Sequence, residues 1–334
     1  MKDLLSTLIA GRNLSPAETE AIFDRLFAGE ADPVQVGGIL AALEAKGVTA
    51  TELAAAARSM RRHVLPIELD DLAGVVDTCG TGGSGSGTFN VSTAVAIVAA
   101  ACGVRVVKHG NRAVSSKTGS ADVLEELGVS LDADPIRSLD EAGICFAFAR
   151  KHHPAMRFVT PIRQALGVPT IFNLLGPLTN PAGVRRQLLG VGRPNRPDRL
   201  EFVANALLEL GCDRAWVVYS DDGQDDLAPG AMNTIAEVAD GRVRTWRLNP
   251  AELGLKGDVA ALRVETPAES AALIRRILDG DEQGAPRDSV LLNAAAAVVI
   301  AGGCDDLAEG LDAARHALDT GRAAETLEKL ASVR

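Results

Sequence analysis

Aromatic side chains and long apolar runs are scarce in this sequence. Phe, Trp and Tyr make up 3% of its 334 residues. Its longest apolar stretch, residues 290–304, is broken by Asn293 and two glycines, so it is too short and too interrupted to span a membrane. The first residues place an acid at position 3 and lack the basic head of a secretory signal. We therefore expect a cytoplasmic protein without a membrane segment.

Paired cysteines and basic clusters are also missing. The five cysteines are scattered singly, with no CxxC pair and no Cys/His spacing typical of zinc sites. We expect reduced thiols that lie mostly in the core. The net charge is −10 and no dense basic run occurs, so the chain lacks the positive surface that nucleic acid requires. We expect no nucleic-acid partner.

The N-terminal 65 residues predict a series of short helices. Each helix start has a capping residue followed three positions later by Glu or Gln. The three patterns are Ser15 with Glu18, Asp32 with Gln35, and Thr49 with Glu52. Helices of this length are stable in water only when their apolar faces pack against other elements. The pattern predicts a small all-helical domain over residues 1–65.

From residue 75 onwards, short apolar runs alternate with helical segments. Strands are predicted at residues 75–79, 104–110, 144–149, 187–191 and 215–220. This alternation is typical of parallel strands joined by helices that cover both faces of a sheet. Two further runs, 234–238 and 242–248, are separated by Asp-Gly and predict a hairpin at the sheet edge. The expected class is α/β: a small helical domain plus a large α/β domain with a mostly parallel central sheet, over residues 70–160 and 182–334.

Residues 77–94 read DTCGTGGSGSGTFNVSTA and form a glycine-rich loop between a strand and a helix. Backbone N–H groups exposed at a helix N-terminus attract anions, so the loop predicts a phosphate cradle, to which Asn90, Ser92 and Thr93 would add donors. A flexible turn is the alternative. The glycines also fit GxGxxG, but the loop runs on to about Phe89, whereas a dinucleotide site needs a tight turn straight into the helix.

A second polar segment, KHGNR at residues 108–112, follows the next strand on the same predicted edge. Lysine supplies a mobile charge to phosphate oxygens, and Asn can bind a neutral polar group. Ser120 is expected to cap the helix that starts at Ala121, which makes a second anion-friendly position. Two cradles on one edge suggest a ligand with phosphate at both ends. Solvated loop residues are the alternative.

The segment DDGQDD, residues 221–226, places clustered carboxylates directly after a predicted strand. Carboxylates are hard oxygen ligands, and Mg²⁺ commonly binds one or two of them together with substrate phosphates. A solvated acidic turn is the alternative, but phosphate cradles nearby favour the metal.

These motifs together resemble the anthranilate phosphoribosyltransferase family, from the N-terminal helices almost to the C-terminus. The matching segments are GTGGSGSGTFNVST (80–93), KHGNRAVSSKTGSADVLE (108–125), HHPAMRFVTPIRQALGVPTIFNLLGPLTNPAG (152–183), RQLLGV (186–191) and the acidic pair (225–226). The resemblance implies the nucleoside phosphorylase/phosphoribosyltransferase type of fold. It also implies a helical domain completed by about residues 161–181 and a homodimer formed through the helical domains.

The resemblance implies a pentosyl transfer in tryptophan biosynthesis, from phosphoribosyl pyrophosphate to the amine of anthranilate, giving N-(5-phosphoribosyl)anthranilate and pyrophosphate. The implied donor residues are Gly80, Thr81, Gly82, Gly83, Thr88, Asn90, Ser92, Thr93, Lys108 and Ser120. The implied anthranilate residues are Gly80, His109, Asn111, His153 and Arg163. Ser92 would contact one Mg²⁺, and Asp225 with Asp226 would hold a second. Catalysis would proceed by positioning, through Lys108, Asn111 and Arg163, without an acid or base.

The sequence departs from the family pattern at two positions. Ser84 stands where the family usually has Asp, and Asp226 stands where it usually has Glu. The alternatives are a pyrimidine nucleoside phosphorylase-like enzyme, which would bind inorganic phosphate, a paralogue that uses another aromatic amine, and a protein that has lost catalysis.

Overall fold

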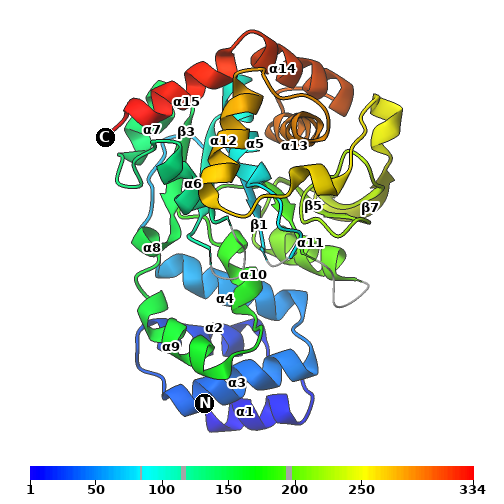
Figure 1. The fold of residues 1–334 in the computed structure, drawn as a ribbon. Helices are drawn as coiled ribbons and strands as arrows, with labels where there is room; N and C mark the ends of the chain where they lie inside the picture. The colour runs from blue at the N-terminus through cyan, green and yellow to red at the C-terminus, as the bar shows by residue number, and fades with distance from the viewer. Residues whose placement is uncertain (83–84, 114–117, 193–197) are drawn as a thin grey trace.

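The computed structural model describes residues 1–82, 85–113, 118–192 and 198–334, which form a helical layer below an α/β part (Figure 1). The N-terminal helices of the layer are α1 (Lys2–Ile9), α2 (Pro16–Phe27), α3 (Pro33–Lys46) and α4 (Ala50–Arg62). Ser15 and Thr49 cap α2 and α4 in reciprocal capping boxes, and Asp32 caps α3. All three predicted helix starts are confirmed.

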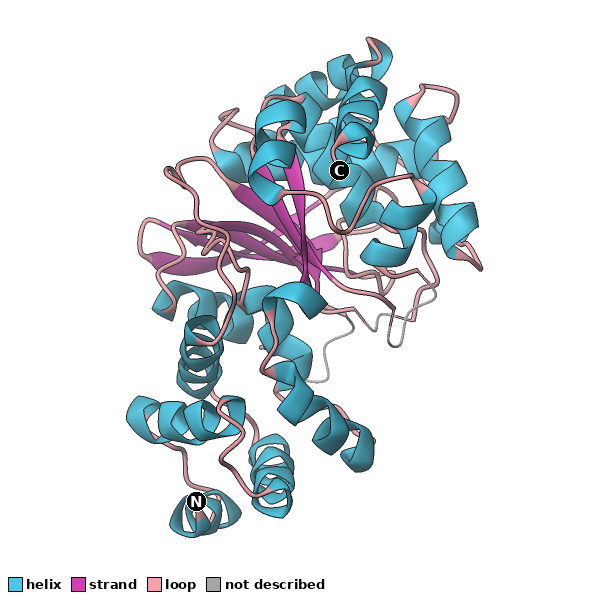
Figure 2. Ribbon diagram, turned by 90° about the vertical axis from the view of Figure 1, so that its left-hand side faces the viewer, coloured by secondary structure: helices cyan, strands magenta, loops and turns pink. Residues whose placement is uncertain are grey.

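The α/β part is built on a seven-stranded sheet in the order β3-β2-β1-β4-β5-β6-β7, seen in magenta in Figure 2. The strands are β1 (Val76–Gly80), β2 (Val106–Gly110), β3 (Ile144–Phe148), β4 (Arg186–Gly190), β5 (Arg214–Ser220), β6 (Asn233–Ala239) and β7 (Arg242–Leu248). The strand pairs β3–β2, β2–β1, β1–β4 and β4–β5 are parallel. The pairs β5–β6 and β6–β7 are antiparallel. The predicted mostly parallel sheet and its edge hairpin are confirmed.

Alternate residues of the strands face two different cores, because successive side chains of a strand point to opposite faces. On one face, Trp216 and Val218 of β5 pack against the C-terminal helices and α5. These helices are α5 (Val91–Ala101), α6 (Ser120–Glu126), α12 (Pro267–Leu278), α13 (Ala285–Ala301), α14 (Leu307–Asp319) and α15 (Arg322–Ser332). On the other face, Ala215 and Val217 pack with α11 (Arg199–Glu209) and with the helical layer.

The chain returns to the helical layer between β3 and β4. The elements of this stretch are α8 (Ala149–His152), α9 (Met156–Leu166), α10 (Phe172–Leu175) and the 3₁₀ helix η1 (Gly176–Leu178). Helix α9 packs near the end of α2, where Gly29 has a φ of +75° and an added Cβ would lie 2.6 Å from the Phe158 ring, so the position favours glycine. Residues 156–175 therefore belong to the helical layer, while the bounds of the two domains stay a prediction.

The remaining helical elements complete the α/β part. They are α7 (Pro135–Ala142), η2 (Pro250–Leu253) and η3 (Val259–Leu262). Cys79 and Cys145 are buried, but Cys102, Cys212 and Cys304 are only partly buried because each follows the last turn of a helix. The expectation that most cysteines lie in the core is thus wrong for three of five. Over the described ranges, no helix has the length and apolar character needed to cross a membrane.

Candidate active site

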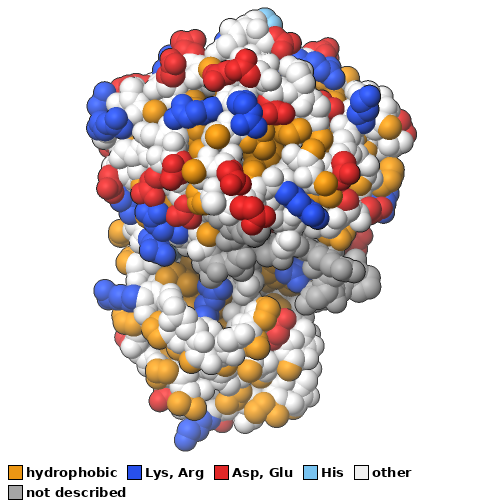
Figure 3. All heavy atoms as spheres, viewed as in Figure 1, with side chains coloured by type: hydrophobic (Ala, Val, Ile, Leu, Met, Phe, Trp, Pro, Cys, Tyr) orange, Lys and Arg blue, Asp and Glu red, His pale blue; other side chains and the backbone are white. Residues whose placement is uncertain are grey.

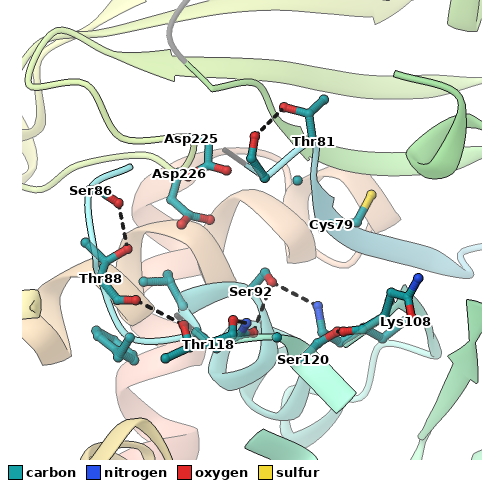
Figure 4. A pocket seen from close by; sticks show the side chains of 18 of the residues that line it. Cys79, Thr81, Ser86, Thr88, Ser92, Lys108, Thr118, Ser120, Asp225 and Asp226 are labelled. Atoms are coloured by element: carbon teal, nitrogen blue, oxygen red, sulfur yellow. Dashed lines mark hydrogen bonds between the residues drawn. The ribbon is translucent and has the colours of Figure 1, made fainter. Parts of the chain in front are cut away.

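A cavity of about 400 Å³ opens at the carboxyl ends of β1 and β2. Ligands of open parallel sheets bind at this edge. The glycine loop, the end of β2, the start of α6 and the acidic loop after β5 all line it (Figure 4). The structure therefore brings together three motifs that are up to about 150 positions apart in the chain.

The glycine loop begins at the last residue of β1. An added Cβ at Gly80 would lie 3.2 Å from Asp225 Oδ2, so a side chain here would crowd the acidic loop. Gly82 has a φ of +65°, a conformation that residues with side chains rarely adopt. Thr81 Oγ1 accepts a hydrogen bond from Gly192 N at 3.1 Å, which ties the loop to the chain after β4. Gly83 and Ser84 lie outside the described residues.

Asn90 is the N-cap of α5 and organises the start of this helix. Its Oδ1 accepts from Thr93 N at 3.2 Å and from Thr93 Oγ1 at 2.5 Å, and its Nδ2 donates to Thr118 O at 2.9 Å. Asn90, Ser92 and Thr88 line the cavity, but Thr93 does not. The Thr93 hydroxyl therefore holds Asn90 instead of facing the cavity.

Lys108 is a buried lysine on β2, with 2% of its surface exposed. Its Nζ donates to Thr78 O at 2.8 Å and to Ser92 Oγ at 2.9 Å. Burial lowers its pKa, and the nearby carboxylates of Asp77 and Asp226 partly oppose this effect. Since an ammonium group has three N–H donors, one donor stays available to a ligand in the cavity.

His109 follows Lys108 and points to the opposite face of β2, toward the helical layer. Its Nε2 lies 3.0 Å from Nε2 of His153, and the backbone of Gly176 acts to raise the pKa of its ring. In the contact between the two rings, one neutral ring donates and the other accepts. Burial lowers the pKa of His109 to about 3 and that of His153 to about 4, so both rings are neutral.

The sequence predicted that Ser120 caps α6, and this prediction is wrong. The helix begins at Ser120 and its N-cap is Gly119, where an added Cβ would collide with Ala113 N. This close approach of two loop segments excludes a capping side chain at position 119. Ser120 lines the cavity and its Oγ donates to Asn111 O at 3.2 Å. Asn111 is exposed at the cavity mouth.

Arg112 lines the cavity but its guanidinium is bound by carboxylates of α6. Nη1 and Nη2 donate to the two oxygens of Glu125 at 2.6 and 2.9 Å, and Nη1 also donates to Asp122 Oδ1 at 2.8 Å. These ion pairs fix the loop of residues 111–113 against α6.

Asp225 and Asp226 lie across the cavity from Ser92 and Lys108 (Figure 4). Burial and the adjacent Asp225 carboxylate raise the pKa of Asp226. Across the described ranges, no group of three or more His, Cys, Asp or Glu side chains could hold a metal ion. Two carboxylates can supply two ligands, so a cation bound by this pair would take others from a substrate. Such a cation would relieve the repulsion between the two carboxylates, so the residues fit Mg²⁺ bound with substrate phosphates.

Two asparagines and one glycine hold the acidic loop, and the sequence reasoning missed all three. Asn293 bonds both the N–H and the C=O of Leu227, at 2.9 and 2.8 Å, and Asn233 does the same for Ala228, at 2.8 and 3.0 Å. At Gly190, the last residue of β4, an added Cβ would collide with the Asp225 carbonyl. A buried Asn inside an apolar helix was the available signal.

Arg163 lies on α9 in the helical layer and does not line the cavity. Its Nη2 donates to Asn173 Oδ1 at 3.4 Å, and its guanidinium carbon lies 5.7 Å from the centroid of the Phe172 ring. His153 also stands behind the cavity wall, beyond His109. The structure thus places the implied anthranilate residues on both sides of the junction between helical layer and α/β part.

On the face shown in Figure 3, acidic and basic side chains are interspersed.

Two family models match the chain. The α/β domain of a glycosyl transferase family matches residues 72–324, and the helical bundle domain of a glycosyl transferase family matches residues 2–64. Among curated relatives, an anthranilate phosphoribosyltransferase of Thermomicrobium roseum is 47% identical, over 98% of this chain and 95% of the relative. One of Phenylobacterium zucineum is 48% identical, over 99% of this chain and 98% of the relative.

Solved structures agree with these relatives. Anthranilate phosphoribosyltransferase of Thermus thermophilus has a TM-score of 0.90 and 44% identity, covering 98% of both chains. The Saccharomyces cerevisiae enzyme in complex with PRPP and Mg has a TM-score of 0.87 and 26% identity, over 98% of this chain and 95% of that one. Its complex with 4-fluoroanthranilate has a TM-score of 0.85 and 25% identity, over 99% and 97%. With similarity over nearly its whole length, the chain belongs to the anthranilate phosphoribosyltransferase family.

Proposed function

We propose that the protein transfers the phosphoribosyl group of 5-phosphoribosyl 1-pyrophosphate to the amine of anthranilate. The products would be N-(5-phosphoribosyl)anthranilate and pyrophosphate, in tryptophan biosynthesis. The observation that carries this proposal is the cavity in which Lys108 and the glycine loop face Asp225 and Asp226. A diphosphate needs both cationic donors and a shared divalent cation, and this cavity offers a place for each.

The donor would bind with its pyrophosphate at the glycine loop. Gly80, Thr81 and Gly82 supply backbone at the wall, and Ser92 and Lys108 supply a hydroxyl and an ammonium group. These groups can stabilise the negative charge that builds on the leaving pyrophosphate, because they are already oriented before the reaction. Asn90 and Ser120 would contact the rest of the donor.

Asp225 and Asp226 would hold one Mg²⁺ and Ser92 would contact another. When bound, these ions would neutralise negative charge on the pyrophosphate. The protein's own part is to present carboxylate oxygens at a fixed place, which Asn233 and Asn293 secure through the loop backbone. Two structures of the Saccharomyces cerevisiae enzyme contain Mg, one of them together with PRPP, which supports this assignment.

The acceptor would enter from the side of the helical layer, with His109 and Asn111 at the cavity wall and Arg163 as the cation for its carboxylate. An aromatic amine is already neutral near pH 7, so its nitrogen can attack C1 of the ribose without a strong base. The lowered pKa of His109 agrees with this, because a neutral ring adds no positive charge beside a sugar that gains oxocarbenium character. Positioning of the two reactants would supply most of the acceleration, at best roughly 7–11 kcal/mol.

We also propose that the protein works in the cytoplasm as a homodimer formed through its helical layer. Ile9 of α1 and Val34 of α3 are 72% and 83% exposed. Large apolar side chains this exposed support an interface at this end of the molecule.

A fluorescence assay of anthranilate consumption with phosphoribosyl pyrophosphate and Mg²⁺ tests the function. We expect consumption by the parent protein, dependent on both additions, and a large loss in Asp225→Asn. If the parent consumed no anthranilate but accepted another aromatic amine, the protein would be a paralogue with a different acceptor. Phosphate-dependent cleavage of a pyrimidine nucleoside would instead indicate a nucleoside phosphorylase.

A further inference from the structure

Asp77 is a fully buried carboxylate to which the proposed substrate sites assign no role. It lies on β1 and is 0% exposed. Its Oδ1 accepts a hydrogen bond from His109 N at 3.0 Å, and its Oδ2 accepts one from Asn180 Nδ2 at 2.9 Å. This carboxylate therefore joins the end of β2, where the cavity wall lies, to the chain that follows η1.

The chain passes between the α/β part and the helical layer at two places after β3. We name residues 149–155 the first crossing and residues 176–181 the second crossing. Side chains of other elements hold the second crossing through its carbonyls. Pro177 O accepts from Gln187 Nε2 at 2.7 Å, and Leu178 O accepts from Arg61 Nε at 2.8 Å. The second crossing is thus fixed to both β4 and α4.

His109 contacts both crossings. Its Nε2 lies 3.0 Å from Nε2 of His153 in the first crossing, and the backbone of Gly176 in the second crossing affects the pKa of its ring. Its backbone N–H is held by Asp77. The two hydrogen bonds that Asp77 accepts therefore help to set how the crossings meet the end of β2, together with the bond from Asn180 Nδ2 to Val107 O.

We propose that Asp77 is a positioning residue for the acceptor, acting on Arg163 from a distance. Through His109 and Asn180 it fixes both crossings, and the stretch between them is α9 and α10. Helix α9 carries Arg163, whose orientation at the acceptor site follows from where the crossings lie. This inference rests on the proposed function, because it takes Arg163 as the cation for the anthranilate carboxylate.

A carboxylate suits this place because its two strong partners are both N–H donors. Burial raises its pKa to about 6, so it is ionised and purely accepting at neutral pH. In Asp77→Asn, the side-chain NH₂ group would face one of these two N–H donors. Two donors that face each other in a buried place cannot form a hydrogen bond, so the neighbouring segments would move apart. Asp77→Asn therefore tests the hydrogen bonds with almost no change in volume.

Steady-state kinetics of a double-mutant cycle tests the inference. Asp77→Asn and Asn180→Ala should each raise the anthranilate KM about tenfold in the parent background. Asn180→Ala keeps the Asp77 charge near Lys108, so its donor KM should stay within about twofold of the parent value. In an Arg163→Ala background, each change should add less than about twofold, because the group that they position is gone. Full additivity would overturn the inference, because residues that only support the fold act independently of Arg163.

A control variant sharpens the result. Glu237→Gln is the matched control, since Glu237 is a buried carboxylate of β6 that accepts from Arg244 and Trp246. Glu237→Gln should leave the KM values for both substrates unchanged. If it raised the anthranilate KM as much as Asp77→Asn does, the loss of any buried carboxylate of the sheet would have this effect, and the specific role of Asp77 would be rejected.

Two further outcomes are distinguishable. If Asp77→Asn does not fold, Asn180→Ala carries the cycle alone with the same expectation. If Arg163→Ala by itself leaves the anthranilate KM unchanged, the acceptor role of Arg163 fails and this inference falls with it, a result different from additivity.

Discussion

The ammonium group of Lys108 donates a hydrogen bond to Ser92 Oγ at 2.9 Å. This contact joins the end of β2 to the first turn of α5, the two elements that would grip the pyrophosphate of the donor. Because Lys108 is 2% exposed, the protein keeps a cation in a poorly solvated place where its interaction with a phosphate is strengthened.

Lys108→Met should remove this interaction while preserving the length of the side chain. We expect kcat/KM for the donor to fall about 10²–10³-fold, the usual cost of losing one preorganised donor to a developing anion. The unfolding free energy should fall, because the change leaves the Thr78 carbonyl without its donor and the buried Asp77 and Asp226 carboxylates without a neighbouring cation. Steady-state kinetics and urea unfolding measure the two effects, and a donor kcat/KM within threefold of the parent would contradict the assignment.

The neutral pair His109 and His153 should lower stability in acid. Their pKa values are lowered to about 3 and about 4, whereas unfolded histidines titrate near about 6.5. Between these values the two histidines bind more protons in the unfolded chain than in the folded one, so their contribution to the unfolding free energy should fall as pH drops below about 6.5, while the raised pKa values of Asp77 and Asp226 act in the opposite direction. Urea unfolding at pH 7, 6 and 5 measures this slope.

His153→Gln is the matched test of that slope. Gln can still hydrogen-bond to His109 Nε2 but does not titrate, so stability should fall less steeply with acid than in the parent. An identical slope in both proteins would mean that other groups dominate the acid dependence.

Gly190→Ala should displace the acidic loop, since its new Cβ meets the Asp225 carbonyl. We expect a loss of about 1–3 kcal/mol in stability, typical of overpacking, and a higher Mg²⁺ concentration for half-maximal activity. Gly37→Ala serves as the control, because its Cβ would meet atoms of α9 no closer than 3.9 Å and it replaces a glycine inside a helix. That variant should gain up to about 1 kcal/mol and keep the parent Mg²⁺ response.

Val34→Asp should weaken the proposed dimer, since it places a charge on an apolar side chain that is 83% exposed. We expect light scattering to report a monomer, or a dimer that dissociates at higher protein concentration than the parent. Ile136→Asp on α7, at 41% exposure in the α/β part, should leave the oligomeric state unchanged. A dimer of parent strength in Val34→Asp would place the interface elsewhere.

Local signals in the sequence predicted much of the fold. The capping pairs at Ser15 and Thr49 act within one helical turn, and the apolar run of β5 lies within one strand, so both can be read from neighbouring residues. The carboxyl ends of parallel strands share one edge, so the meeting of the glycine loop with Lys108 could also be anticipated.

Contacts between distant segments account for what the sequence did not predict. Position 119, the cap of α6, has no room for a side chain because residue 113 passes too close, and this approach leaves no pattern in adjacent residues. The inward turn of Thr93 has a local cause, since Asn90 three positions earlier accepts its hydroxyl. Arg163 is a further case without a local pattern, because its distance from the cavity depends on how the helical layer is set against the sheet.

The most direct measurement of the central claim is a crystal structure of the protein soaked with phosphoribosyl pyrophosphate and Mg²⁺ in the absence of an acceptor. The account predicts the pyrophosphate between the glycine loop and Lys108 on one side and a Mg²⁺ held by Asp225 and Asp226 on the other. A donor bound with its pyrophosphate away from Lys108, or a metal without either aspartate as a ligand, would contradict it.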